Sequence, residues 1–306
     1  AMTQVGDGAG QIWPKGKHSI GYTEQWSIDL QYQIAKHAVV EAGYTGTRGR
    51  RLMYGNPDLN ANQLPTQLLA LGRDALSQQV DNPFYGVITD SNSPLSGEKV
   101  PYNQLLRPFP QFTYLNYARS LPGGSSAYDA LNLKFTKQFS NGLSMISSYS
   151  WSKALDNGSE DFVGWAIGGL WRDAYNTKLD YAISMHDVPQ SFVTAFVYQM
   201  PFGRGKRWGS GSSGIINEIL GSWEVSGVVR LTSGLPLLAP FYSSNSLWDF
   251  GFPGQGVPNL VGNPKPAHQT TDNWINPDAF AEPADMTYGN MPARMTQLRE
   301  SATKNV

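Results

Sequence analysis

Apolar and polar residues alternate with a period of two in several parts of the chain, as in β-strands with one apolar and one polar face. The longest uninterrupted example is residues 26–34, which read WSIDLQYQI. The alternation recurs in residues 40–45, 131–136, 143–152, 192–200 and 223–231, and residues 235–242 and a segment near Ile20 are further candidates. It is weaker in 192–200, where Val193 and Val197 make the second face partly apolar. The sequence therefore predicts an all-β protein.

The connections between the predicted strands alternate between short and long. Residues 35–37 and 140–142 are short, and Asn141-Gly142 between alternating segments is a strong hairpin signal. The long connections are about 48–125, 153–189 and 243–306, and the strand regions are about 20–54, 126–153 and 189–243. Leucine spacing in residues 63–79 predicts a short helix inside the first long connection. We expect all the long connections at one end of the sheet.

The alternation of short and long connections indicates a membrane barrel, because outer-membrane barrels combine short periplasmic turns with long extracellular loops. Structureless connections of this length are uncommon in compact soluble domains. The polar strand faces carry mostly Ser, Thr, Gln and Asn, as expected of a wet lumen, and Trp26, Trp151 and Trp223 lie on apolar faces where an interfacial aromatic girdle is expected. We predict an antiparallel up-and-down transmembrane β-barrel segment with long extracellular loops, and a soluble β-sandwich is the alternative.

Composition narrows the classes of function. A net charge of −1 gives no broad basic surface for nucleic acid. The chain has no cysteine, which excludes disulfides, thiol catalysis and cysteine-ligated metals. No apolar run approaches the ~18 residues of a transmembrane helix. The first residues also lack the basic and apolar regions of a signal peptide.

Motifs of enzymatic chemistry are absent from the sequence, which contains no Gly-x-Ser-x-Gly, His-Glu-x-x-His, P-loop or dinucleotide fingerprint. We interpret His186-Asp187 as a loop pair and Gly203-Arg204-Gly205-Lys206 as a periplasmic turn. No catalytic residue, metal site or cofactor is predicted, and we do not expect an enzyme. A hydrolase that uses two carboxylates is the alternative.

Two groups of residues are candidates for contact with a solute. Aromatic platforms bind sugars or hydrophobic ligands, and the long loops contain Trp165, Trp171, Tyr175, Trp248, Phe250 and Trp274. Packing of the loops against themselves explains these aromatics equally well. Charged residues on the polar strand faces are candidates for the lumen: Asp29, Glu41, Lys134, Glu224 and Arg230.

Nine short motifs, in order along about 200 residues, resemble the C-terminal part of Oar-like TonB-dependent receptors, which are outer-membrane transporters abundant in acidobacteria. The motifs are Gly43-Tyr44-Thr45-Gly46, Asn82-Pro83-Phe84, residues 105–112 (LLRPFPQF), residues 126–131 (SAYDAL), residues 149–156 (YSWSKALD), Asp187-Val188-Pro189, residues 201–207 (PFGRGKR), Gly221-Ser222-Trp223 and Ser233-Gly234-Leu235-Pro236.

The resemblance implies a large plugged barrel, of the kind that has 22 strands, preceded by a carboxypeptidase-regulatory-like domain, a TonB box and a plug. We find none of these preceding parts here. Arg299-Glu300-Ser301-Ala302 stands where the family has Arg-Gly-Pro-Gly, and the closing aromatic strand is missing. We therefore expect an incomplete barrel.

The expected function is that of a fragment of an outer-membrane TonB-dependent receptor, which takes up or binds an unidentified solute. The expected partners are outer-membrane lipid, the solute and, through the missing N-terminal part, the TonB system; nucleic acid is not expected. A soluble all-β carbohydrate-binding or glycoside-hydrolase-like domain is the alternative function.

Overall fold

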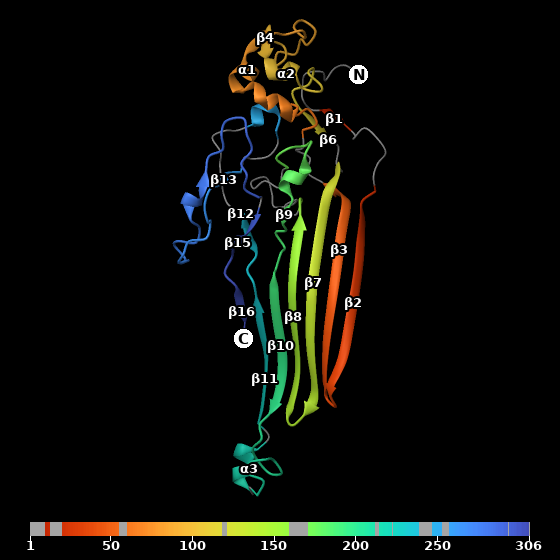
Figure 1. Ribbon diagram of the computed structural model, residues 1–306, viewed down its shortest axis with the longest axis vertical. Helices are drawn as coiled ribbons and strands as arrows, with labels where there is room; N and C mark the ends of the chain where they lie inside the picture. Colours follow the sequence, from red (N-terminus) through yellow and green to blue (C-terminus); the bar gives the residue numbers. More distant parts are fainter. Residues whose placement is uncertain are drawn as a thin grey trace.

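The computed structural model describes residues 10–12, 20–54, 60–117, 121–158, 171–211, 214–221, 223–238, 247–252, 257–292 and 294–305. Figure 1 shows one tall sheet, a folded cap at one end of it and a small helical turn at the other end. Among the described residues, no helix is long and apolar enough to cross a membrane.

The tall sheet is antiparallel, and its strands follow one another in chain order. Its strands are β2 (Tyr22–Ala35), β3 (Ala38–Tyr54), β7 (Leu121–Ser140), β8 (Leu143–Asp156), β10 (Gln190–Gln199), β11 (Glu224–Thr232) and β16 (Thr303–Asn305), with the short β9 (Ala182–Ile183) pairing with β8. The six segments predicted by alternation all lie in this sheet. In the described part of the chain the sheet is open, with β2 and β16 at its edges.

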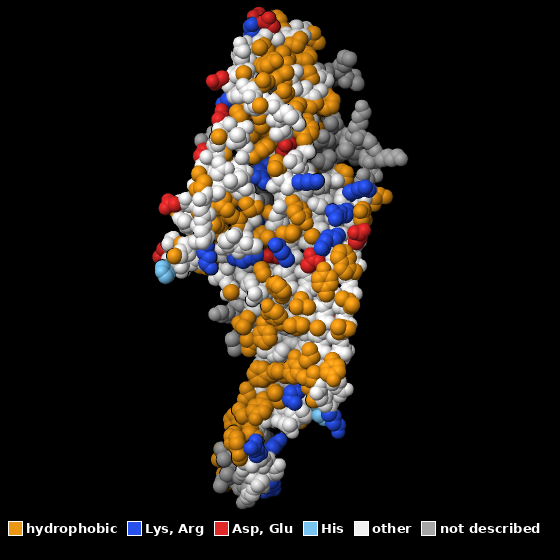
Figure 2. All heavy atoms as spheres, viewed as in Figure 1, with side chains coloured by type: hydrophobic (Ala, Val, Ile, Leu, Met, Phe, Trp, Pro, Cys, Tyr) orange, Lys and Arg blue, Asp and Glu red, His pale blue; other side chains and the backbone are white. Residues whose placement is uncertain are grey.

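Register gives the sheet one apolar and one polar face, because residues directly opposite each other on neighbouring strands share a face. One row across the sheet reads Leu30, Ala42, Leu133, Tyr149, Phe192 and Leu231. The adjacent row, on the other face, reads Gln31, Glu41, Lys134, Ser148, Val193 and Arg230. The apolar face is uncovered: Leu30 is 72% exposed and Trp151 is 60% exposed. Figure 2 shows hydrophobic side chains gathered over the sheet below a band of charged side chains.

Two of the short connections are tight hairpins. Asn141 and Gly142 both have positive φ, 53° and 80°, as a type I′ turn requires. β2 and β3 are joined across Lys36 and His37. The third connection at this end is longer and contains α3 (Ile215–Leu220).

The long connections fold together with residues 10–12 and 236–238 into the cap. Its strands are β1 (Gly10–Ile12), β4 (Gln79–Asp81), β5 (Lys99–Pro101), β6 (Leu115–Tyr117), β12 (Pro236–Leu238), β13 (Asn259–Leu260), β14 (Phe280–Ala281) and β15 (Arg294–Arg299). Its helical turns are η1 (Thr66–Leu71), α1 (Arg73–Ser77), α2 (Tyr102–Leu105), η3 (Thr177–Asp180), η4 (Trp248–Phe250) and η5 (Pro277–Ala279). η1 and α1 fill the predicted helical segment, interrupted by Gly72 at φ 82°.

The two further candidate strands differ from the prediction. Ile20 precedes β2, which begins at Tyr22. From residues 235–242, only β12 is a described strand, and it pairs with β15 in the cap and not with the tall sheet; residues 239–242 lie outside the described residues. β12 leaves the tall sheet because Ser233-Gly234 turns the chain toward Glu300, with Gly234 packed against the Glu300 carbonyl.

Polar contacts between the three long connections hold the cap together. Gln63 Nε2, from the first, donates to Asp173 Oδ1 of the second at 2.7 Å. Arg73, from the first, pairs with Asp285 of the third at 2.8 Å. The main buried apolar cluster likewise joins the first and third connections and contains Leu64, Leu69, Leu76, Leu247, Phe250, Phe252 and Met286. The long connections are therefore one folded body.

Candidate functional site

The polar face of the sheet carries the five charged residues predicted to line the lumen. Glu41 and Lys134 are register partners, and Lys134 Nζ lies 3.4 Å from Glu41 Oε2. Arg230 lies on the same row, three strands further on. Asp29 lies on the same face of β2, and Glu224 lies on the same face at the start of β11. The structure therefore brings three of the five onto one row.

The carboxylates on this face are too widely spread for two-carboxylate hydrolysis through Glu224. β7, β8 and β10 separate Glu41 from Glu224, which corresponds to about 19 Å at about 4.8 Å per strand. Glycosidases hold their two carboxyl groups about 5–9.5 Å apart. Asp29 lies one strand further from Glu224. Glu41 instead forms an exposed ion pair with Lys134.

Two of the predicted loop aromatics are interior residues of the cap. Trp171 and Phe250 are each 1% exposed. Trp171 Nε1 donates to the Asn157 carbonyl, and Phe250 packs in the cluster of Leu64 and Leu76. Neither ring offers a face to a solute, because both stabilise the cap from within.

The remaining loop aromatics lie nearer the surface. The Tyr175 hydroxyl donates to the Gln63 carbonyl at 3.1 Å, and Trp274 Nε1 donates to the Arg299 carbonyl at 2.8 Å. Trp248, on η4, is 59% exposed and lines a pocket. Trp165 lies outside the described residues. Among the predicted aromatics that the structure describes, Trp248 is the most exposed and the one that lines this pocket.

The pocket beside Trp248 has a volume of about 600 Å³ and lies between the first and third long connections. Its lining combines the aromatic ring with amide, hydroxyl and guanidinium groups: Ser77, Gln79, Asn103, Gln104, Arg107 and Trp248. Pockets of about 300–1,000 Å³ with a few placed polar groups are the usual size and character of small-molecule sites. We take it as the candidate site of the cap.

Arg107 is the principal cation of this pocket. Its guanidinium donates to the Thr113 carbonyl at 2.7 Å, to Asn103 Oδ1 at 3.2 Å and to the Asp249 carbonyl at 2.7 Å. Its buried Nε has no partner in the structure. Burial lowers the pKa of Arg107 to about 10, so the side chain stays charged at neutral pH. The pocket thus holds a fixed positive charge.

Sequence reasoning missed Arg107 as a site residue, although it lies in the LLRPFPQF motif. Gln104 Nε2 donates to the Pro110 and Phe112 carbonyls, both at 2.8 Å, and so folds the proline-rich segment back onto α2. The signal available in the sequence was a row of polar residues directly before and within this motif. The place of Arg107 in the pocket depends on its hydrogen bond to the carbonyl of Asp249, which lies 142 residues away in sequence.

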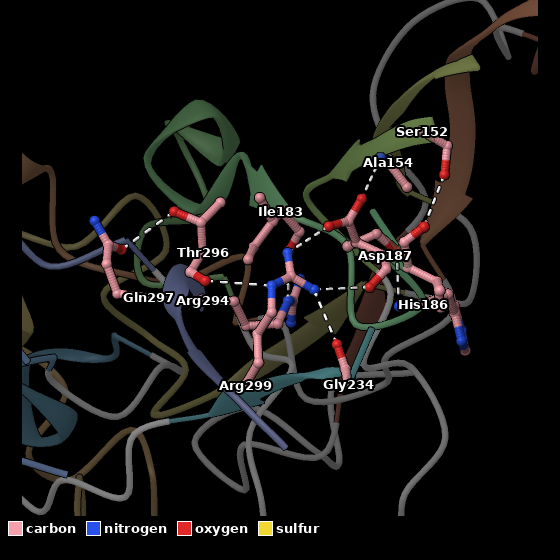
Figure 3. A network of polar contacts seen from close by, with 12 residues as sticks. Ser152, Ala154, Ile183, His186, Asp187, Gly234, Arg294, Thr296, Gln297 and Arg299 are labelled. Atoms are coloured by element: carbon pink, nitrogen blue, oxygen red, sulfur yellow. Dashed lines mark hydrogen bonds and ion pairs between the residues drawn. The ribbon is translucent and has the colours of Figure 1, made fainter. Parts of the chain in front are cut away.

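A polar junction joins the cap to the upper end of the sheet (Figure 3). Arg299 donates to Asp187 Oδ2 at 2.5 Å and to the Asp187 and Gly234 carbonyls. Asp187 Oδ1 in turn accepts the Ala154 backbone N–H of β8 at 2.6 Å. Asp187, from the predicted His186-Asp187 pair, is therefore an anchor of the cap. No cluster of three or more His, Cys, Asp or Glu suited to a metal occurs among the described residues.

An uncovered apolar sheet face, a polar opposite face and long connections gathered at one end together define a segment of an outer-membrane β-barrel. The chain matches the family model "Outer membrane beta barrel domain" over residues 3–306, and it belongs to that family. The protein is therefore located in the bacterial outer membrane, and the predicted barrel segment is confirmed over the alternative of a soluble β-sandwich. Searches of curated proteins and of solved structures gave no match.

The apolar face has a height close to that of the apolar band of outer-membrane barrels. On β7, the apolar positions Leu131, Leu133 and Phe135 lie between Asp129 and Lys137 on the same face. Eight residues at about 3.4 Å each give about 27 Å along the strand, or about 20 Å after a tilt of about 40°. Outer-membrane barrels present an apolar band about 25 Å tall. This face therefore contacts lipid, and the polar face lines the lumen.

A charged and aromatic cluster marks the upper edge of the lipid-facing band. Arg48 donates to both carboxylate oxygens of Asp129, at 3.1 and 2.9 Å, and the Tyr44 hydroxyl donates to the same carboxylate at 2.6 Å. The guanidinium also lies 5.3 Å from the centre of the Trp26 ring. The Trp26 ring lies directly over its register partner Gly46, where an added Cβ would stand 2.3 Å from the ring. Aromatic girdles occupy this level in such barrels.

Proposed function

We propose that this chain is part of a TonB-dependent receptor and that its cap binds a solute from outside the cell for uptake. The supporting observation is the pocket beside Trp248, which opens in a folded cap at the extracellular end of the barrel segment. An open mixture of aromatic and hydrogen-bonding groups suits an oxygen-rich solute such as an oligosaccharide. The ordered sequence motifs support the receptor class.

The proposed role is binding and transport without chemistry on the solute. In receptors of this class the TonB system supplies energy through a plug and a TonB box. Outer-membrane lipid surrounds the sheet, and the charged row with Glu41, Lys134 and Arg230 lines the passage. Nucleic acid is not among the proposed partners.

Uptake of labelled oligosaccharides by cells carrying the full receptor tests this proposal. We expect surface binding that depends on the receptor, followed by uptake that stops when a protonophore removes the proton gradient or when TonB is deleted. Trp248→Ala should reduce surface binding, whereas Trp274→Phe, at a ring bonded to the Arg299 carbonyl, should not. Uptake that continues unchanged in de-energised cells would indicate a passive pore and contradict the proposal.

A further inference from the structure

The connection between β10 and β11, residues 200–223, is longer than the two tight hairpins at the same end of the sheet (Figure 1). Hydrogen bonds order its described residues, 200–211, 214–221 and 223. The Trp208 N–H donates to the Pro201 carbonyl at 2.9 Å, and the Gly203 N–H donates to the Trp208 carbonyl at 3.0 Å. Gly203, at φ 106°, lies against Gly221, where an added Cβ would stand 2.7 Å from the Gly221 Cα. The two arms of the connection are therefore in direct contact.

This connection exposes large apolar side chains next to the lipid-facing side of the sheet. Ile215 is 78% exposed and Ile219 is 60% exposed, one helical turn apart on α3. Trp223 is 61% exposed, and its Nε1 donates to the Ile219 carbonyl at 2.6 Å. Trp223 precedes Val225 by two residues, so it lies on the lipid-facing side of β11. This hydrogen bond connects α3, which lies beyond the end of the sheet (Figure 1), to the lipid-facing side of β11.

A second arm of the connection combines aromatic and basic side chains. Phe202 and Trp208 have ring centres 5.3 Å apart and are 42% and 52% exposed. Arg204, Lys206 and Arg207 lie in the turn between them, all exposed, and Arg207 stands 5.7 Å from the Trp208 ring centre. The connection has one acidic residue, Glu218. Its net charge is positive, and its apolar groups continue the lipid-facing band.

We propose that the described part of this connection, residues 200–211, 214–221 and 223, forms a binding site for anionic phospholipid in the periplasmic leaflet. Ile215, Ile219 and Trp223 insert beside the barrel, as the apolar face of an interfacial helix does. Arg204, Lys206 and Arg207 then bind the headgroup phosphates by charge-assisted hydrogen bonds. The periplasmic position follows from the short-turn end of an outer-membrane barrel. The proposal is independent of which solute, if any, the cap binds.

Site-specific labelling is direct because the chain has no cysteine of its own. The Ile215→Cys chain, carrying a polarity-sensitive fluorophore, is reconstituted into phosphatidylcholine vesicles with or without phosphatidylglycerol, and either lipid is supplied in brominated form. We expect a blue-shifted emission and stronger quenching by brominated phosphatidylglycerol than by brominated phosphatidylcholine.

Charge variants test the headgroup contact. Lys206→Gln/Arg207→Gln in the labelled chain should reduce the preference for the anionic lipid roughly tenfold or more, because each basic residue near an anionic surface contributes appreciably to binding. The matched control Lys178→Gln/Lys265→Gln removes the same charge from exposed cap residues and should leave the preference unchanged. Circular dichroism of each variant checks that the sheet is retained.

Three results would overturn the proposal. Equal quenching by the two brominated lipids would show that the site does not select anionic headgroups. Emission typical of water, without quenching, would place α3 away from the membrane. Failure of the chain to associate with either kind of vesicle would likewise contradict insertion of α3 into the membrane. Ile219→Ser provides a second variant, which should weaken quenching by both lipids if insertion depends on the apolar face.

Discussion

The sheet and the cap treat apolar side chains in opposite ways. In the sheet, Leu30 is 72% exposed and Ile28 is 64% exposed, whereas in the cap Leu64 and Leu298 are fully buried. The residue types are the same, but their surroundings differ. Lipid solvates the outer face of the sheet, so its leucines need no protein neighbours. The cap stands in water and must bury its leucines to gain stability.

Polar groups show the same contrast. The sheet satisfies its backbone through strand ladders and carries an exposed ion pair, Lys134 with Glu41. The cap has little regular structure and relies on buried ion pairs, such as Arg299 with Asp187 and Arg172 with Asp180. Removing one partner of a buried ion pair strongly destabilises the fold, because the remaining charge is left buried without a partner. The cap is therefore the region most sensitive to polar substitutions.

The largest effect is expected from Asp187→Ala. This change leaves Arg299 without its carboxylate and the Ala154 N–H without its acceptor, at a side chain only 2% exposed. We expect a loss of about 3–5 kcal/mol in cap stability. Hydrogen exchange should show faster opening of the cap while β7 and β8 remain protected.

The control for this change is Asp81→Ala, which removes an exposed partner of Lys99 with a side chain 94% exposed. It should leave cap stability almost unchanged, because water screens an ion pair this exposed. Equal destabilisation by the two variants would contradict the assignment of Asp187 as the anchor of the cap.

The next effect concerns the lipid-facing side of the sheet. Leu133→Arg places a charge at the middle of the apolar band and should disfavour insertion by about 2–4 kcal/mol. Asn132→Arg is its matched control, because the neighbouring position on β7 faces the lumen across from Ser150. Folding into vesicles, followed by heat-modifiable migration, measures both. If the two arginines are tolerated equally, the assignment of the two faces is incorrect.

Alternation predicted the sheet because each strand lies between lipid and water and keeps a period of two along its length. The cap had no such signal. Its strands are two to six residues long, and pairs such as β12 with β15 join segments more than 50 residues apart in sequence. Sequence could not separate buried Trp171 from exposed Trp248, because both lie in long connections between strands. Arg107 emerged as a pocket residue only when its contact with Asp249 was visible.

A smaller effect is expected at the pocket. Trp248→Ala should weaken oligosaccharide binding by about 0.5–1.5 kcal/mol through loss of aromatic contact. Cap stability should stay almost unchanged, because the side chain is largely exposed. Trp248→Phe retains an aromatic face and should restore most of the binding. Titration of labelled oligosaccharide with each variant measures the difference, and a large loss of cap stability in Trp248→Ala would contradict a role in binding alone.

The smallest effect is a pH dependence of the cap. Hydrogen bonding from Arg73 holds the pKa of Asp285 below its ordinary value of 3.8. Because the folded pKa is the lower one, the contact stabilises the cap above pH ~4, and this contribution is lost as the pH falls through the folded pKa. Both side chains are partly exposed, so the contribution is below about 1 kcal/mol.

Asp285→Asn tests this contact better than a change of Arg73, because the Arg73 guanidinium also lies 5.3 Å from the centre of the Phe250 ring in the cap core. The asparagine can still accept the Met286 N–H, which is bonded to Asp285 Oδ1 at 2.9 Å. Burial raises the pKa of Asp180, so its own contribution has the opposite sign and decreases as the pH rises. Cap stability is measured by hydrogen exchange between pH 3 and 6. In Asp285→Asn, the decrease in cap stability toward acid pH should become smaller, and the contribution of Asp180 should remain. A pH profile identical to that of the unmodified chain would show that the Arg73–Asp285 pair contributes nothing measurable, and the stability of the cap would then rest on its buried contacts alone.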